Sequence, residues 1–65
     1  MRQLLHLVRP GARPEALADR DWVVYLDPLS LDPRGAPLPS PITSGPLDHD
    51  QLVALVFAAD LVVTW

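Results

Sequence analysis

The chain has 65 residues, enough for one domain, and a domain of this size buries only about 60% of the surface that its unfolded chain exposes. Its net charge is −3 and its five Arg are scattered without any Lys, so it lacks a basic stripe for phosphates and we expect no direct contact with nucleic acid. The sequence has no Cys, which excludes disulfides and thiolate metal sites.

The distribution of apolar residues indicates where in the cell the protein is expected. No apolar run reaches the roughly 20 residues that a membrane helix needs. The apolar segment before Arg9 and Pro10 is too short for the core of a signal peptide. We therefore expect a cytoplasmic protein without a membrane partner. The eight Pro, the use of Arg in place of Lys and the lack of Asn agree with a thermophilic source.

Two apolar runs in the first half predict buried strands of a parallel sheet. The run Gln3–Val8 is closed by Pro10 and Gly11, and Trp22–Leu26 is nearly continuous and rich in β-branched and aromatic residues. The segment between them has about the minimum length for a crossover between parallel strands. Within it, Pro14 followed by Glu15 predicts a short helix over Pro14–Asp19.

The composition changes over 27–46, which holds six of the eight Pro and two of the three Gly. Because Pro removes ladder donors and breaks helices, this segment is predicted to be a Pro-rich loop with at most a short extended piece at Pro41–Thr43. A loop of this length in so small a domain is normally functional, docked against a partner or the remnant of a lost element. Four apolar residues are expected to hold it to the sheet: Leu29, Leu31, Leu38 and Ile42.

The last nineteen residues predict a capped helix followed by a third strand. Asp48 with Gln51 forms a capping box, so the helix should begin at His49 and run to about Ala59. The strand follows at Leu61–Trp65. The predicted fold is therefore one small α/β domain over 1–65, with a three-stranded, mainly parallel sheet, one short helix and one longer helix.

The C-terminal helix also indicates association. No residue from Leu52 to Ala59 is polar, and three strands with a short helix cannot cover such a helix on every side. Leaving Val53 and Phe57 in water would forfeit several kcal/mol, which is comparable with the stability of a small domain. We therefore expect an oligomer, with Val53, Phe57 and Trp65 as candidate interface residues.

Three polar residues are candidates for a ligand pocket: His6, Asp27 and His49. His6 lies within a predicted strand, and Asp27 follows a strand at the edge where open α/β sheets bind ligands. His49 stands between two Asp. Each also has a plain structural explanation, since His6 can be a hydrogen-bonded core residue, Asp27 before Pro28 can form a turn, and the Asp residues beside His49 can cap the helix.

Catalytic signatures are missing from the sequence. There is no Gly-rich phosphate loop, and no Ser lies in a nucleophile elbow. Neighbouring residues of a helix point in different directions, so His49 and the adjacent Asp residues do not converge on one metal ion. We therefore expect no catalytic residue, no metal and no cofactor, and the protein is not expected to be an enzyme.

The stretch Leu47–Leu55, running on to Trp65, resembles the end of the DsrH/TusB family of sulfur-relay proteins. Those chains finish with an aliphatic-Asp-aromatic-x-x-aromatic-Val-x-Leu pattern and, ten residues later, with Trp; here His49 and Leu52 take the aromatic positions. Leu5-His6 in the first strand and the stretch Asp21–Asp27 are also similar to that family. The matching segments cover roughly half of the chain, and family members are around a third longer.

The resemblance implies a truncated DsrE/DsrH-like sheet subunit that assembles with DsrE-like and DsrF-like partners. Such complexes transfer sulfur for tRNA 2-thiouridine synthesis or sulfur oxidation. Because persulfide carriage requires a Cys thiolate and this chain has none, the implied role is that of a non-catalytic structural subunit. The alternative from the residues alone is a stand-alone homo-oligomer that binds a small ligand between subunits, near Asp27 and the Pro-rich loop.

Overall fold

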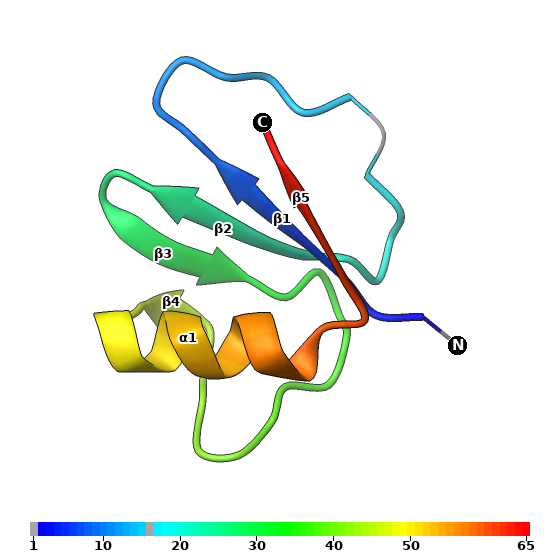
Figure 1. Ribbon diagram of the computed structural model, residues 1–65, viewed down its shortest axis with the longest axis vertical. Helices are drawn as coiled ribbons and strands as arrows, with labels where there is room; N and C mark the ends of the chain where they lie inside the picture. Colours follow the sequence, from blue (N-terminus) through cyan, green and yellow to red (C-terminus); the bar gives the residue numbers. More distant parts are fainter. Residues whose placement is uncertain (1, 16) are drawn as a thin grey trace.

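The computed structural model describes residues 2–15 and 17–65, which form one sheet with a helix on one face (Figure 1). The strands follow the order β4-β3-β2-β1-β5 across the sheet, and β1 is parallel to both β2 and β5. The elements in chain order are β1 (Leu4–Val8), β2 (Trp22–Leu26), β3 (Leu29–Asp32), β4 (Gly45–Pro46), α1 (His49–Ala58) and β5 (Leu61–Thr64).

The prediction of a three-stranded, mainly parallel sheet is wrong, because the segment predicted as a Pro-rich loop contains two further strands. β3 turns back antiparallel to β2, and β4 pairs antiparallel with β3, so the five-stranded sheet is mixed. β3 occupies the Pro-free window between Pro28 and Pro33. β4 has only two residues and ends the sheet, where Pro46 is tolerated because an edge strand needs no donor on its outer side.

The short helix predicted over Pro14–Asp19 is also wrong for the part that the structure describes. Residues 14–15 and 17–19 are not helical, and Ala16 lies outside the described residues. Hydrogen-bonded turns take up both ends of the crossover: the N–H of Ala12 donates to the Arg9 carbonyl, and the N–H of Asp21 donates to the Ala18 carbonyl. The segment left between these turns is too short for a stable helix, because the first turn of a helix is costly to form.

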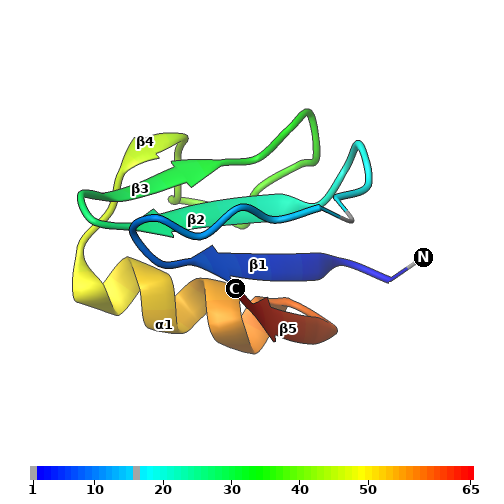
Figure 2. The same cartoon turned by 90° about the horizontal axis from the view of Figure 1, so that it is seen from above.

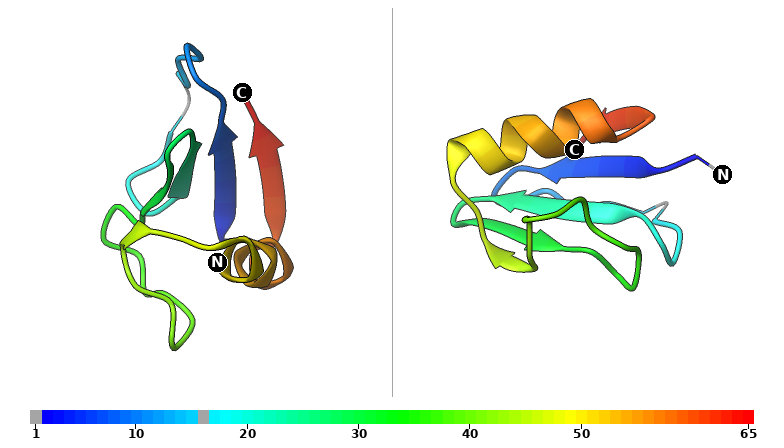
Figure 3. Two further views of the ribbon diagram at one scale, coloured as in Figure 1. Left: turned by 90° about the vertical axis from the view of Figure 1, so that its left-hand side faces the viewer. Right: turned by 90° about the horizontal axis from the view of Figure 1, so that it is seen from below.

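The helix α1 begins as predicted. The Asp48 carboxylate accepts from the N–H of Gln51 at 2.8 Å, and the Gln51 side chain accepts from the N–H of Asp48 at 3.0 Å. The two side chains thus satisfy two backbone donors that a helix start leaves free. Views from opposite sides show α1 along the β1–β5 half of the sheet (Figures 2 and 3).

The main core lies between the sheet and α1. Alternate strand residues, Leu5 on β1 with Trp22 and Val24 on β2, meet Leu55, which is the fully buried residue of the helix. The Pro-rich segment before β4 covers the rest of this face. Of the four apolar residues expected to hold this segment, Ile42 is buried in the core cluster and Leu38 packs against it. Leu29 and Leu31 contact the core as residues of β3, and are thus part of the sheet itself.

Among the described residues, those of the crossover between β1 and β2 cover the opposite face of the sheet, on the far side from α1 in Figure 1. Residues of β1 and β2 that alternate with those of the main core point to it, and His6, Val8 and Val23 are buried there. Tyr25 on β2 and Leu61 on β5 belong to this face by register and remain 44% and 46% exposed. This thinly covered face, called the crossover face below, carries the polar site.

Candidate functional site

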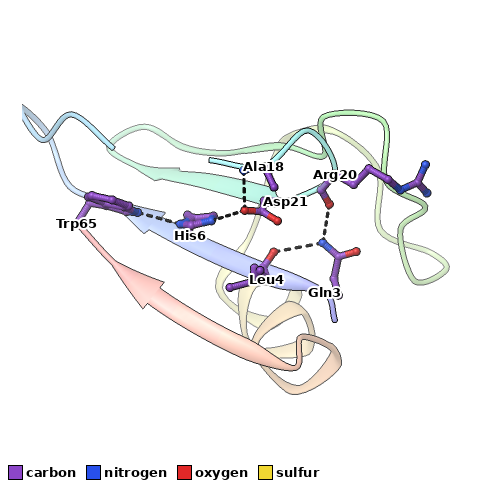
Figure 4. A network of polar contacts seen from close by, with 7 residues as sticks. All are labelled: Gln3, Leu4, His6, Ala18, Arg20, Asp21 and Trp65. Carbon is purple, nitrogen blue, oxygen red and sulfur yellow. Dashed lines mark hydrogen bonds and ion pairs between the residues drawn. The ribbon is translucent and has the colours of Figure 1, made fainter. Parts of the chain in front are cut away.

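A chain of three polar side chains crosses the crossover face (Figure 4). The indole N–H of Trp65 donates to Nδ1 of His6 at 2.9 Å, and Nε2 of His6 lies 2.7 Å from Oδ2 of Asp21. The same Asp21 oxygen accepts from the backbone N–H of Ala18 at 3.0 Å. His6 and Asp21 are buried, with 3% and 5% of their surfaces exposed, so the bond between them lies away from solvent, while the bonds from Trp65 and Ala18 are part-buried.

The period of the strands brings the three residues together. His6 is the middle residue of β1, and its register partners are Val23 on β2 and Val63 on β5. Asp21 precedes Val23 by two residues and Trp65 follows Val63 by two residues, so both point to the same face as His6. The network therefore joins the end of the crossover, the strand β1 and the end of β5.

The hydrogen-bond inventory fixes the tautomer of His6. An indole N–H can only donate, so Nδ1 of His6 must present its lone pair to Trp65. The ring hydrogen then lies on Nε2, which donates to the Asp21 carboxylate. The His6 and Trp65 rings also pack against each other, with centroids 5.9 Å apart. Every polar atom of the His6 ring is satisfied, as expected for a buried group.

An Asp–His pair has a known chemical use, because in hydrolytic triads a carboxylate orients an imidazole whose other nitrogen removes a proton from a nucleophile. Here the other nitrogen of His6, Nδ1, already accepts a hydrogen bond from the indole N–H of Trp65. The indole N–H can only donate, so Trp65 supplies no nucleophile at the position where a triad would need one. No pocket opens next to the ring in the described parts of the chain. In this arrangement the network holds three segments together and presents no free base.

Further hydrogen bonds fasten β5 to β1 on both sides of this network. At the carboxyl end, the side chain of Arg9 donates from Nε to the Trp65 carbonyl at 2.8 Å, and the N–H of Trp65 donates to the Leu7 carbonyl at 2.8 Å. At the other end, the N–H of Gln3 donates to the Asp60 carboxylate at 2.6 Å, and the N–H of Asp60 donates to the Gln3 carbonyl at 2.8 Å. The Gln3 side chain also donates to the carbonyls of Leu4 and Arg20 (Figure 4).

The three ligand-pocket candidates do not meet. His6 is enclosed on the crossover face, whereas Asp27 is exposed in the two-residue turn between β2 and β3, and His49 is exposed as the first residue of α1. The turn and the start of α1 lie at the same end of the sheet, since the N–H of Leu47 donates to the carbonyl of Leu29. Among residues 2–15 and 17–65, no three His, Asp or Glu side chains gather as a metal site would require.

Two of the three interface candidates, Val53 and Phe57, lie on the outer side of α1. Phe57 is 84% exposed and Val53 is 39% exposed, and Val56 beside them is 38% exposed. These residues belong to the stretch of α1 without polar side chains, and they form what we call the outer face of α1. Trp65 is only half-buried and takes part in the polar network.

Sequence reasoning considered His6 as a pocket candidate and Trp65 as an interface candidate, and it missed that both belong to one network with Asp21. The signal was present in the alternation of side chains along the strands, because Asp21 and Trp65 each lie two positions from a residue that is paired with His6. This alternation is informative only when the pairing register of the strands is known, and that register was not predictable from nearly continuous apolar strands. The indole N–H of Trp22 is a second feature that sequence did not indicate, since it is buried without a partner among the described residues.

In the described residues, the fold and the network define a small α/β protein with a mixed five-stranded sheet, one covering helix and a Trp-His-Asp network in which His6 and Asp21 are buried. Comparison of the chain with protein-family models, with curated proteins and with solved structures finds no match. In the described parts of the chain, no helix combines the length and the apolar character needed to span a membrane.

Proposed function

We propose that the protein is a non-catalytic assembly subunit that docks onto partner proteins through the outer face of α1. The observation that carries this proposal is the 84% exposure of Phe57, flanked by Val53 and Val56. Burying a large apolar side chain contributes about 1.5 to 3 kcal/mol, so covering these three residues would contribute several kcal/mol to association. Large exposed apolar patches on small proteins mark interaction sites.

The structure of α1 itself favours docking over a role in the core. Leu55 is the buried residue of the helix, while the residues of the outer face, Val53, Val56 and Phe57, are exposed to solvent. The capping box fixes the start of the helix, and the hydrogen bond from the N–H of Ala59 to the Leu55 carbonyl extends its end. A rigid helix loses little conformational entropy on binding, which makes an apolar face on it an effective anchor.

We further propose that the partners are DsrE-like and DsrF-like subunits of a sulfur-relay complex. The support is the similarity of Leu47–Leu55 and Trp65 to the end of DsrH/TusB chains. In such a complex a Cys of a partner would carry the persulfide, since this chain has no thiolate to do so. The protein would then contribute surface and geometry to tRNA 2-thiouridine synthesis or sulfur oxidation.

The test is co-expression with DsrE-like and DsrF-like subunits encoded in the same genome, followed by purification through a tag on this chain. We expect a stable complex with the wild-type chain and with Asp50→Ala, which changes the solvent side of the first helical turn. Phe57→Asp should abolish the complex, because it would bury an unpaired carboxylate in an apolar contact.

Thr43→Asp provides the matched control. It adds the same charge at an exposed position before β4, outside the outer face of α1, and should leave the complex intact. The proposal fails if the wild-type chain forms no complex with these subunits, or if Phe57→Asp assembles as well as Thr43→Asp. Circular dichroism of each variant shows whether a lost complex reflects lost docking or lost folding.

A further inference from the structure

The two edges of the sheet differ in how they are protected against further pairing. At one edge β4 has only Gly45 and Pro46, and Pro has no N–H to offer a new strand. At the other edge β5 has four residues, Leu61–Thr64, none of them charged and none of them Pro. Natural proteins normally blunt edge strands with charges, Pro, bulges or covering segments. β5 carries none of these devices in the described structure.

The hydrogen bonds at Trp65 show which backbone groups of β5 face the open edge. Trp65 donates to the Leu7 carbonyl at 2.8 Å and accepts from the N–H of Arg9 at 3.4 Å, so its backbone polar groups are directed at β1. Backbone polar groups alternate sides along a strand, hence those of Val63 share this direction. The N–H and C=O groups of Val62 and Thr64 therefore point away from β1, to the open edge.

We propose that β5 is a self-association site, at which a second copy of this chain adds its own β5 antiparallel to form one continuous sheet across a two-fold axis. In an antiparallel pair, two opposed residues can exchange both of their N–H to C=O bonds. With Val63 opposite Val63 of the second copy, Val62 lies opposite Thr64 of that copy, and Thr64 opposite Val62. This register satisfies all four open donor groups with four acceptors from the same strand.

The side chains of β5 suit a copy of the same strand. On the crossover face the register places Leu61, which is 46% exposed, opposite Trp65 of the second copy, and aliphatic–aromatic cross-strand pairs stabilise antiparallel sheets. Although each chain has a net charge of −3, no charged residue lies within Leu61–Trp65. The nearest carboxylate, Asp60, is turned toward β1 by its bond with the N–H of Gln3. Two copies therefore meet at this edge without opposed like charges.

The strand is also held ready for pairing. The bonds of Trp65 with His6 and Arg9 at one end, and those between Gln3 and Asp60 at the other, fix β5 in an extended conformation before any partner arrives. A preordered edge loses less entropy on association than a mobile one. This inference goes beyond the docking of α1, because it rests on the backbone of β5 and needs no other protein.

The test compares Thr64→Pro with Thr64→Val by sedimentation equilibrium over a wide range of protein concentration. Wild-type protein should shift from the 7.2 kDa monomer to about twice that mass. Thr64→Pro removes one open-edge donor from each copy, two of the four bonds, and should raise the dimer Kd roughly 10- to 100-fold. Thr64→Val retains the donor and should stay within about 3-fold of wild type. Pro at this position faces the open edge, so pairing with β1 is kept.

Hydrogen exchange supplies a second readout that does not depend on a variant. The amides of Val62 and Thr64 should exchange more slowly as protein concentration rises, whereas the Trp65 amide, bonded to Leu7, should be protected at every concentration. A wild-type protein that stays monomeric up to millimolar concentration overturns the inference, as does a Thr64→Pro variant that dimerises like wild type. Loss of the dimer in Phe57→Asp, with Thr64→Pro unaffected, would also overturn it by placing the interface on α1.

Discussion

The substitution Asp21→Ala tests whether the buried network holds the fold together. The Asp21 carboxylate accepts two hydrogen bonds through one oxygen, from Nε2 of His6 at 2.7 Å and from the N–H of Ala18 at 3.0 Å. Removing it leaves both donors without a partner, and the His6 ring is 97% buried by its neighbours (3% exposed).

The expected loss is large for a protein of this size. Leaving a buried neutral donor without its partner typically costs about 1 to 3 kcal/mol, and Asp21→Ala affects two donors. Small domains have about 0.05 to 0.15 kcal/mol of stability per residue, which gives roughly 3 to 10 kcal/mol for this chain. Asp21→Ala should therefore remove a major fraction of the stability and leave a substantial unfolded population. Asp21→Asn keeps an oxygen that can accept from both donors and should cost about 1 kcal/mol.

Urea unfolding followed by Trp fluorescence measures these losses, with the slope of free energy against urea checked for constancy. The control is Asp19→Ala, an exposed carboxylate in the same crossover, which should change the free energy of unfolding by less than about 0.5 kcal/mol. In the wild type, ¹⁵N NMR should show the His6 hydrogen on Nε2. The reasoning is refuted if Asp21→Ala costs no more than Asp19→Ala, or if Asp21→Asn is as damaging as Asp21→Ala.

Two further substitutions test the helix. Asp48→Ala removes the side chain that accepts from the N–H of Gln51, and the free energy of unfolding should fall by about 1 kcal/mol with reduced helical circular dichroism. An unchanged urea midpoint would show that the cap contributes nothing. Leu55→Ala should cost about 2 to 5 kcal/mol, because this fully buried residue joins α1 to the sheet. A loss below 1 kcal/mol in the same urea experiment would mean that α1 is not needed for the core.

The elements with strong local signals were predictable from the sequence, and those fixed by tertiary context were not. The strands at β1, β2 and β5 were indicated by apolar runs, and the start of α1 by its capping box. β3 was missed because it follows β2 after a two-residue Asp-Pro connection, which is not among the turn sequences that signal a hairpin. β4 was missed because two residues that include Pro carry no strand signal at all.

The short helix was predicted from Pro14 and Glu15, which favour a helix start but do not supply the apolar face that stabilises one. The crossover instead ends in a turn over Ala18–Asp21, in which the N–H of Ala18 donates to the Asp21 carboxylate and the N–H of Asp21 donates to the Ala18 carbonyl. For His6, the plain explanation as a hydrogen-bonded core residue is confirmed, but its two partners, 15 and 59 residues away, were beyond local reasoning.

The network also explains why β5 pairs with β1 in a single register. Almost every residue of β5 is apolar, so a shift by one position would still bury apolar side chains, and hydrophobic patterning specifies the register only weakly. Such a shift would move Trp65 to the opposite face of the sheet and break its bond with Nδ1 of His6. It would also exchange the backbone groups directed at β1 with those directed at the open edge. The bond between Trp65 and His6 therefore selects which donors and acceptors β5 presents to a second copy, so the residue that completes the polar network also defines the surface proposed for association.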